Sequence, residues 1–568
     1  MSSQHPIAAA SAKYPKPVDR TFQYGTAGVV SHEGVRIQAI LTSPVNGVIL
    51  CKNETDACFS FLLDSVVYRV GLLAALRSRK LNGQTIGVMI TASHNPPEDN
   101  GVKLVDPMGE MLEGSWETHA TRLANAPSDQ ALLEIYDKLT SDVNIKTGIK
   151  ARVVFARDTR ASGSRLVSAL VAALEASGTE YTDYKLLTTP QLHYITRCLN
   201  TKGTPYEYGE PTEQGYYQKI AAAFKAASGT RKFNGPITVD CANGVGGPKL
   251  RELIKYLPSA AEGGLEIKVV NDNVVEPERL NYQCGADFVK TNQRPPPSSH
   301  TAALARCASL DGDADRLMYY FIDSDSIFHL LDGDRIATLA ALFIGDLARS
   351  AGLGEKIKVG VVQTAYANGA STSYITQDLK LPVVCTPTGV KHLHHAATRF
   401  DVGVYFEANG HGTVVFSDLA LKRIGKYEPQ SPAQSSALDT LRALTALINQ
   451  TVGDALSDLL LVEVILAHKA WGPKEWHLTY TDLPNRLGRI EVADRNIFKT
   501  TDAERKLESP PGVQAQIDAL VGKYKNGRSF ARASGTEEAV RIYAEAATKG
   551  EADDLAAKVA DVVKRAGV

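Results

Sequence analysis

The chain reads Ile86-Gly87-Val88-Met89-Ile90-Thr91-Ala92-Ser93-His94-Asn95-Pro96 where a short apolar run ends in a polar loop. Such runs are typical of buried strands, and α/β folds bind ligands in loops at the carboxyl ends of their strands. An apolar stripe at helical spacing predicts a helix from about Asp64 to Lys80, with Asp64 as its cap. Further strand-like runs alternate with helical patterns at residues 152–155, 237–239, 358–362 and 402–406. This alternation predicts α/β layers.

Size and composition are those of an ordinary soluble protein with several domains. Because 568 residues exceed what one hydrophobic core serves, we expect three or four domains. The 62 basic and 63 acidic residues leave no basic excess, so no nucleic-acid partner is expected. No apolar stretch has the length of a signal-peptide core or a membrane span, which predicts a cytoplasmic protein without a membrane partner. The seven cysteines form no C-x-x-C pair and indicate neither disulfides nor a zinc site.

Ser93 is the first candidate for chemistry. A serine that accepts phosphoryl groups needs a nearby proton acceptor and cations that neutralise the charge it gains. His94 and Lys103 lie in the same loop region and are of the right types. The alternative is structural, since Ser and Asn before a proline are common turn and cap residues.

The second candidate is the acidic string Asp311-Gly312-Asp313-Ala314-Asp315-Arg316, which follows an apolar run. Alternate residues of a straight strand lie roughly 6.6 Å apart, too far for three carboxylates to bind one ion at about 2.1 Å. The backbone must therefore curl, and Gly312 and Ala314 are small enough to permit it. An EF-hand loop is excluded, because Arg316 replaces its glycine and Ile322 its glutamate. A hard-cation site is favoured over a solvated acidic turn.

A third string, Arg532-Ala533-Ser534-Gly535-Thr536-Glu537, is followed by Arg541 and suits a phosphate. Its hydroxyls and backbone N–H groups can form an anion nest, and the arginines supply charged, forked donors. A surface turn before a strand is the alternative.

The fourth string, Phe406-Glu407-Ala408-Asn409-Gly410-His411-Gly412, again ends a strand-like run. A carboxylate and an amide two residues apart suit a pair of sugar hydroxyls, which need an acceptor and a donor. Upstream, the turn at Thr388-Gly389 precedes His392, His394 and His395. These histidines have no adjacent acidic or cysteine partner, which favours packing and substrate-loop roles over a metal site.

The four strings, in this order, resemble the α-D-phosphohexomutase superfamily over nearly the whole chain. The wording at residues 22–28, 91–112, 388–395 and 407–413 is similar to its phosphoacetylglucosamine mutase subfamily. The resemblance implies an α/β fold of four domains around a central cleft, three with mixed sheets and a smaller C-terminal α+β domain. We expect these domains at residues 1–196, 197–323, 324–455 and 456–568.

What the resemblance implies for function is an isomerase that interconverts the 6-phosphate and 1-phosphate of N-acetylglucosamine for UDP-N-acetylglucosamine biosynthesis. Ser93 would carry the phosphoryl group, and a hexosamine 1,6-bisphosphate would be intermediate and activator. One Mg²⁺ per monomeric chain would be held by Ser93, Asp311, Asp313 and Asp315. The implied catalytic residues are Ser93, His94, Lys103, Arg316 and His411. The implied substrate-binding residues are Thr388, Gly389, Glu407, Asn409, Arg532, Ser534, Gly535, Thr536 and Arg541.

One departure from the pattern is the segment Val29 to Leu62, which has no counterpart in it and stands where the pattern has an arginine. The pattern resumes at Leu63-Asp64-Ser65, and our hypothesis is a retained intron. If the segment belongs to the protein, Arg36 is a poor substitute for the missing arginine, and the chain becomes a candidate for an inactive homologue. A phosphoglucomutase or phosphomannomutase is a second candidate function, and a serine-phosphate hydrolase is a third.

Overall fold

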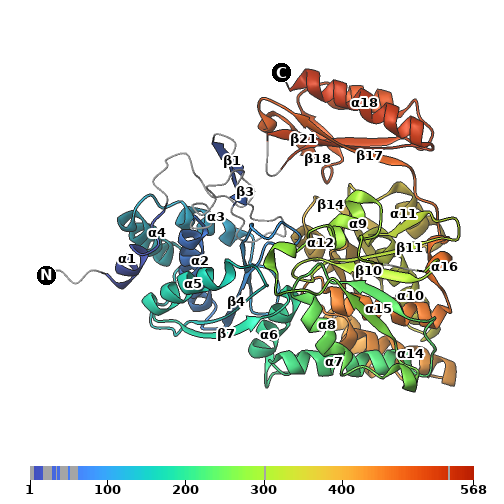
Figure 1. Cartoon of the computed structure of the whole chain (residues 1–568), viewed down its shortest axis with the longest axis horizontal. Helices are drawn as coiled ribbons and strands as arrows, with labels where there is room; N and C mark the ends of the chain where they lie inside the picture. The colour runs from blue at the N-terminus through green and yellow to red at the C-terminus, as the bar shows by residue number, and fades with distance from the viewer. Residues whose placement is uncertain are drawn as a thin grey trace.

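The computed structural model describes residues 5–16, 29–32, 35–38, 49–50, 62–299, 302–534 and 538–567. Four of the described sheets each form the centre of one unit of the chain. Three of these four sheets mix parallel and antiparallel strands. Figure 1 shows the first unit in blue and teal at one side, the second and third packed together in green to orange, and the last in red beside them. The predicted α/β fold class with a smaller C-terminal α+β unit is confirmed.

The first sheet has the strand order β5-β4-β6-β7. Its strand β4 (Thr85–Ile90) is buried throughout and runs parallel to β6 (Arg152–Arg157) and antiparallel to β5 (Val102–Val105). Strand β7 (Glu180–Leu186) lies beyond β6. Helices α2 (Leu62–Lys80) and α5 (Gly163–Ala176) pack closely, because a Cβ on Gly71 would lie 2.8 Å from that of Ala173. Asp64, the predicted cap, lies in the first turn of α2 and pairs with Arg165 of α5.

The second sheet has the order β12-β11-β10-β8-β9. Strand β8 (Ile237–Asp240) is parallel to β10 (Arg306–Leu310), and β10 forms a hairpin with β11 (Leu317–Ile322). The outer strands are β9 (Ile267–Val270) and β12 (Phe328–Leu331). The turn of the β10–β11 hairpin is therefore the string Asp311 to Arg316.

The third sheet repeats this arrangement in the order β14-β13-β15-β16. Strand β13 (Val359–Thr364) is parallel to β14 (Val383–Thr386) and to β15 (Val402–Phe406), and β15 forms a hairpin with β16 (Gly412–Phe416). The turn of this hairpin is Glu407 to His411. Two of the predicted site loops are thus hairpin turns at the ends of buried strands.

The fourth sheet is antiparallel, with β21 (Ala539–Glu545) between β17 (Asn485–Glu491) and β20 (Arg528–Ala533). A small hairpin of β18 (Lys499–Thr501) and β19 (Lys506–Ser509) accompanies it, with α17 (Val513–Val521) and the long α18 (Lys549–Ala566). In Figure 1 this unit is drawn in red, and it contacts the third unit through Arg528, which donates hydrogen bonds to the carbonyls of Ala365 and Ala367.

Helix α15 (Ala455–Lys469) is almost completely buried, and every residue from Ala455 to Leu466 lies inside the protein. A helix that is buried on every side must be enclosed by other elements. It packs against α7 (Glu213–Ser228), α10 (Gly333–Ser350), α14 (Pro432–Leu447) and β11. The predicted boundary after residue 455 places nearly all of α15 in the fourth domain. The contacts of this helix are instead with the second and third units.

The predicted divisions after residues 196, 323 and 455 stay proposals, and the contacts favour shifting each of them. Residue 196 lies inside α6 (Thr189–Thr201), residue 323 lies between two strands of the second sheet, and residue 455 begins α15. The remaining helices are α1 (Pro6–Ser11), α3 (Ser115–Ala124), α4 (Asp129–Asp142), α8 (Gly246–Ile254), α9 (Ala286–Asn292), α11 (Gly369–Ser373), α12 (Val390–Ala397), α13 (Asp418–Lys426) and α16 (Pro473–His477).

The segment Val29 to Leu62 is described only in part. Strands β1 (Val29–His32), β2 (Val35–Gln38) and β3 (Ile49–Leu50) form a small antiparallel sheet. The side chain of Arg36 and the rest of the segment before α2 lie outside the described residues. The retained-intron hypothesis concerns this segment and stays a hypothesis.

Two sequence expectations concern the chain's surroundings. Among the helices that the structure describes, none combines the length and apolar character that crossing a membrane requires. Five of the seven cysteines are described, and each of these is free.

We predict that Leu459→Ala, in the middle of α15, lowers the free energy of unfolding by about 2–5 kcal/mol, because it leaves a cavity in a fully buried region. Denaturant unfolding followed by fluorescence measures the effect. Leu419→Ala is the matched control: this leucine is half exposed, and its loss should change stability by about 0.5 kcal/mol or less. Equal losses for the two variants would contradict the central position of α15.

Candidate active site

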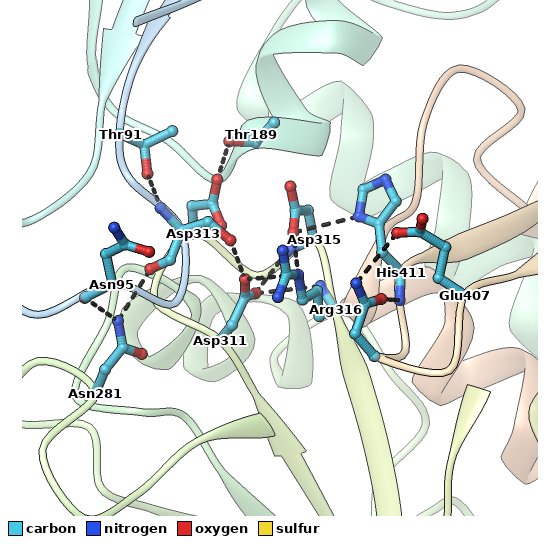
Figure 2. Close-up of polar contacts among 12 residues, drawn as sticks. Thr91, Asn95, Thr189, Asn281, Asp311, Asp313, Asp315, Arg316, Glu407 and His411 are labelled. Atoms are coloured by element: carbon cyan, nitrogen blue, oxygen red, sulfur yellow. Dashed lines mark hydrogen bonds and ion pairs between the residues drawn. The ribbon is translucent and has the colours of Figure 1, made fainter. Parts of the chain in front are cut away.

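Three loops from the first three units meet at one place. The Ser93 hydroxyl donates a hydrogen bond to Oδ2 of Asp311 at 2.6 Å, across 218 positions of sequence. An isolated β-bridge joins Arg316 to His411, and the Leu317 N–H donates to the Gly410 carbonyl at 3.1 Å. The loops that the sequence selected for phosphoryl transfer, cation binding and sugar binding are therefore neighbours, as Figure 2 shows for the last two.

The aspartates Asp311, Asp313 and Asp315 form a buried cluster in which one carboxylate oxygen of each lies within 4.8 Å of the others. Oδ1 of Asp311 accepts hydrogen bonds from the backbone N–H groups of Asp315 and Arg316, which tie the loop into a tight curl. Oδ1 of Asp313 is buried and receives no hydrogen bond from the described part of the chain. Three buried carboxylates with spare oxygen lone pairs fit a hard divalent cation.

Gly312 and Ala314, which we expected to permit the curl of this loop, contribute to it in different ways. Ala314 takes the left-handed conformation, with φ of 56°, and Gly312 has no such φ. Gly312 is required for close approach instead, because a Cβ there would lie 2.5 Å from the carbonyl oxygen of Ser93. Gly244 allows a similar approach from the other side, since its Cβ would lie 2.4 Å from the Gly312 carbonyl oxygen.

Lys103, on β5, extends into the aspartate cluster. Its Nζ lies 2.9 Å from Oδ2 of Asp313 and 3.1 Å from Oδ2 of Asp315. Burial alone would lower the pKa of Lys103, but the two carboxylates outweigh it and raise this pKa above its ordinary value. The side chain is therefore a cation that neutralises part of the cluster's charge.

The aspartates themselves differ in pKa. Burial raises the pKa of Asp311 well above its usual range, and the charges of Asp315 and Asp313 add to the effect. Burial acts in the same direction on Asp315, but Lys103 and His411 outweigh it and hold the pKa of Asp315 well below its usual range. Asp315 is thus the carboxylate that its neighbours favour most strongly in the charged form.

Two histidines flank the cluster. Nδ1 of His411 lies 3.3 Å from Oδ1 of Asp315, with the ring almost fully buried. Burial, followed by the nearby Arg316 guanidinium, lowers the pKa of His94 well below its usual value, so this imidazole is neutral at pH 7. Arg316 itself lies 3.9 Å from carboxylate oxygens of both Asp311 and Asp315.

The predicted sugar loop is ordered by its own side chains. The Asn409 amide donates to Glu407 at 3.1 Å, and the His411 N–H donates to the Asn409 side chain at 3.0 Å. Gly410 has a φ of 85°, and a Cβ there would lie 2.1 Å from the Leu317 carbonyl oxygen. Only glycine fits this contact between the sugar loop (Glu407 to His411) and the end of the cation loop (Asp311 to Arg316).

Two of the predicted phosphate-binding residues, Arg532 and Arg541, lie on the fourth sheet. Arg532 and Arg541 are direct partners across β20 and β21, so their side chains share one face. Arg541 is also paired with Arg489 on β17. Gly535 and Thr536 lie outside the described residues, and Ser534 precedes them at the end of β20. A row of three arginines on one sheet suits an anion.

Glu504 connects the third unit to the fourth. Its Oε2 accepts hydrogen bonds from the N–H and the hydroxyl of Thr388, at 2.9 and 2.6 Å, and its Oε1 lies 3.3 Å from Arg532. The Nε of Arg532 also donates to the Tyr366 hydroxyl at 3.1 Å. The Thr388-Gly389 turn and Arg532, both predicted to bind substrate, are thus held together by a carboxylate that the sequence did not indicate.

Other residues of the site were also missed. Thr189, at the start of α6, donates its hydroxyl to Asp313 at 2.6 Å, and Thr91 donates to Asp158 at 2.7 Å. Asp158 and Arg160 form a fully buried ion pair. One signal was available, because Asp158 and Arg160 follow the apolar run at residues 152–155 just as Ser93 follows its own strand.

Comparisons with known proteins agree over the whole chain. Family models for domains II and III of phosphoacetylglucosamine mutase AMG1 match residues 209–318 and 332–471. Models for domain I and the C-terminal domain of the phosphoglucomutase/phosphomannomutase family match residues 72–131, 130–204 and 489–562.

Similar proteins carry the same names. Phosphoacetylglucosamine mutase of Candida albicans is 47% identical over 99% of this chain and 100% of its own length. A crystal structure of Aspergillus fumigatus N-acetylphosphoglucosamine mutase with GlcNAc-6P and magnesium is 64% identical, with a TM-score of 0.91 and full coverage of both chains. A serine-to-alanine variant of that enzyme with glucose 1,6-bisphosphate is 63% identical, with a TM-score of 0.90 and full coverage of both chains. The chain belongs to the phosphoacetylglucosamine mutase family of the α-D-phosphohexomutases.

Proposed function

We propose that the chain interconverts N-acetylglucosamine 6-phosphate and 1-phosphate with Ser93 as the phosphoryl carrier. The observation that supports this assignment is the 2.6 Å contact between the Ser93 hydroxyl and Asp311, within a cluster of three buried carboxylates. The phosphoserine oxygen transfers its phosphoryl group to the free hydroxyl of the sugar monophosphate, which gives a 1,6-bisphosphate. After the sugar turns over, its other phosphoryl group returns to Ser93. Such transfer depends on positioning and charge neutralisation.

The residues that would hold Mg²⁺ are Asp311, Asp313, Asp315 and an oxygen on Ser93, one ion per chain. When bound, the ion neutralises charge on the transferring phosphoryl group. Lys103 and Arg316 add positive charge at the same place, within 4 Å of the carboxylates. We propose His94, Lys103 and His411 as the candidates for moving protons at the reacting oxygens, because they surround the aspartate cluster. The relatives crystallised with magnesium and with a bisphosphate support this assignment.

The substrate would lie between the third and fourth units. Glu407 and Asn409 present an acceptor and a donor to two sugar hydroxyls, and Thr388 and Gly389 would contact the sugar from the neighbouring turn. Arg532, Ser534, Gly535, Thr536 and Arg541 would bind the phosphate that is not reacting. We further propose a cytoplasmic monomer that supplies UDP-N-acetylglucosamine biosynthesis, consistent with the free cysteines among the described residues.

We predict that Ser93→Ala abolishes turnover of N-acetylglucosamine 6-phosphate while the melting temperature stays near that of the wild type, because a carrier hydroxyl is lost and little packing changes. A coupled assay with Mg²⁺ and catalytic hexosamine 1,6-bisphosphate measures the rate. Ser141→Ala, on the exposed face of α4, is the control and should keep full activity. Wild-type rates in the Ser93 variant would contradict the scheme.

Metal binding can be measured apart from activity. Electron paramagnetic resonance counts free Mn²⁺, which serves as a stand-in for Mg²⁺. We predict that Asp313→Asn weakens Mn²⁺ binding about tenfold or more, because one charged ligand is lost. The exposed Asp325→Asn controls for the change in net charge and should bind as the wild type does. Equal affinity in both variants would place the ion elsewhere.

Substrate choice separates the proposed function from a plain hexose phosphomutase. We predict a higher kcat/KM for N-acetylglucosamine 6-phosphate than for glucose 6-phosphate or mannose 6-phosphate, compared under the same Mg²⁺ and bisphosphate concentrations. A preference for either plain sugar would favour a phosphoglucomutase or phosphomannomutase. Release of inorganic phosphate in place of isomer would indicate a hydrolase. Absence of phosphoryl transfer to Ser93 from a labelled bisphosphate would indicate an inactive homologue.

A further inference from the structure

The backbone of the Ser93 loop is held by two side chains from different units of the protein. Arg160 donates from Nη2 to the carbonyl oxygens of Ser93 and Asn95, at 3.1 and 2.8 Å. Asn281 donates from Nδ2 to the same two oxygens, each at 2.9 Å. Figure 2 shows Asn281 beside Asn95, across the loop from Thr91. Both carbonyls therefore receive two donors, one from the first unit and one from the second.

Arg160 acts from within the first unit as part of a closed network. Its side chain is fully buried and paired with Asp158. Asp158 also accepts the hydroxyl of Thr91, and the Thr91 oxygen in turn accepts the Ser93 N–H at 3.1 Å. The N–H and the carbonyl of Ser93 are thus fixed by one chain of hydrogen bonds.

Asn281 acts from the second unit, which also carries the aspartates. Its own backbone is anchored, because its N–H donates to the Ala242 carbonyl at 2.8 Å. A Cβ on Gly312 would lie 2.5 Å from the Ser93 carbonyl oxygen and 3.0 Å from Nδ2 of Asn281. Arg160, Asn281 and Gly312 therefore enclose the Ser93 carbonyl, and two of the three belong to the unit with the cation loop.

This enclosure holds Ser93 in a conformation that it would not otherwise favour. Its φ is 52°, in the left-handed region, which is sterically unfavourable for a residue other than glycine. Such a conformation persists where the surroundings fix it, and it is common at functional sites. With the backbone fixed on both sides, rotation about one side-chain bond is enough to bring the hydroxyl to Asp311.

We propose that Asn281 and Arg160 are positioning residues that aim the Ser93 oxygen at the aspartate cluster, and that Asn281 couples this aim to the unit carrying the aspartates. The inference rests on the proposed role of Ser93 as phosphoryl carrier. Neither side chain touches the reacting atoms. Their effect is on the geometry of the transfer, for which a misplacement of about 1 Å can cost about 100-fold in rate.

The test is single-turnover phosphoryl transfer from labelled hexosamine 1,6-bisphosphate to Ser93, in N281D and in Q283E of the full-length protein. N281D keeps the side-chain shape and removes the amide donor. Q283E makes the same charge change two residues away, at an exposed position. We expect the rate constant of N281D to fall about 10- to 100-fold with the full amount of Ser93 labelled, and Q283E to match the wild type. Steady-state kcat should fall in N281D with KM nearly unchanged.

A purely structural role gives a different result. If Asn281 only stabilises the fold, the labelled fraction falls and the rate constant of the remaining molecules stays at the wild-type value, which would overturn the proposal. An unchanged rate and fraction would overturn it as well.

Should N281D fail to fold, N281A provides the same comparison without the added charge, and N281Q, which keeps an amide, should recover part of the rate. R160K should slow transfer too, because lysine keeps the charge but cannot form the fork to both carbonyls. Failure of the proposed function itself is distinct, because the wild-type protein would then take up no label.

Discussion

The contact between one hydroxyl and one carboxylate, Ser93 and Asp311, determines how the rest of the molecule must be built. These groups come from different sheets and are 218 positions apart in sequence. They meet because one buried strand of each sheet ends at this place. The loops that follow these strands are short and tightly curled. A third sheet brings Glu407 to His411 to this point through its own hairpin, which is tied to the cation loop by backbone hydrogen bonds.

Charge is the second constraint. Three carboxylates with almost no exposure are costly unless cations accompany them, and the protein supplies Lys103 and Arg316 while leaving oxygen atoms of the cluster for an ion. Close approach is the third constraint. Gly312 and Gly410 stand where a single methyl group would push apart two loops of the site, so these glycines serve proximity between chain segments as well as local turns.

Much of the site could be predicted from sequence because its chemistry lies in short strings that follow apolar runs, as at Ser93, Asp311 and Glu407. The helix at residues 64–80 and the strands that precede these strings were predictable for the same reason. The contributions of Asn281, Arg160 and Glu504 could not be found in this way. Each of these side chains contacts a distant segment, and two of them bind backbone carbonyls, which carry no sequence signal. The position of α15 was missed for another reason, because the pattern of a buried helix does not show which unit encloses it.

The central claim is that Ser93 and the three aspartates share one divalent ion. Anomalous diffraction from crystals grown with Mn²⁺ tests it most directly, because the peak locates the ion independently of any assumed mechanism. The account predicts one peak per chain, about 2.1–2.2 Å from an oxygen of each of Asp311, Asp313 and Asp315 and from an oxygen on Ser93. A peak away from this cluster, or an ion bound by the aspartates with Ser93 turned aside and out of reach, would contradict it.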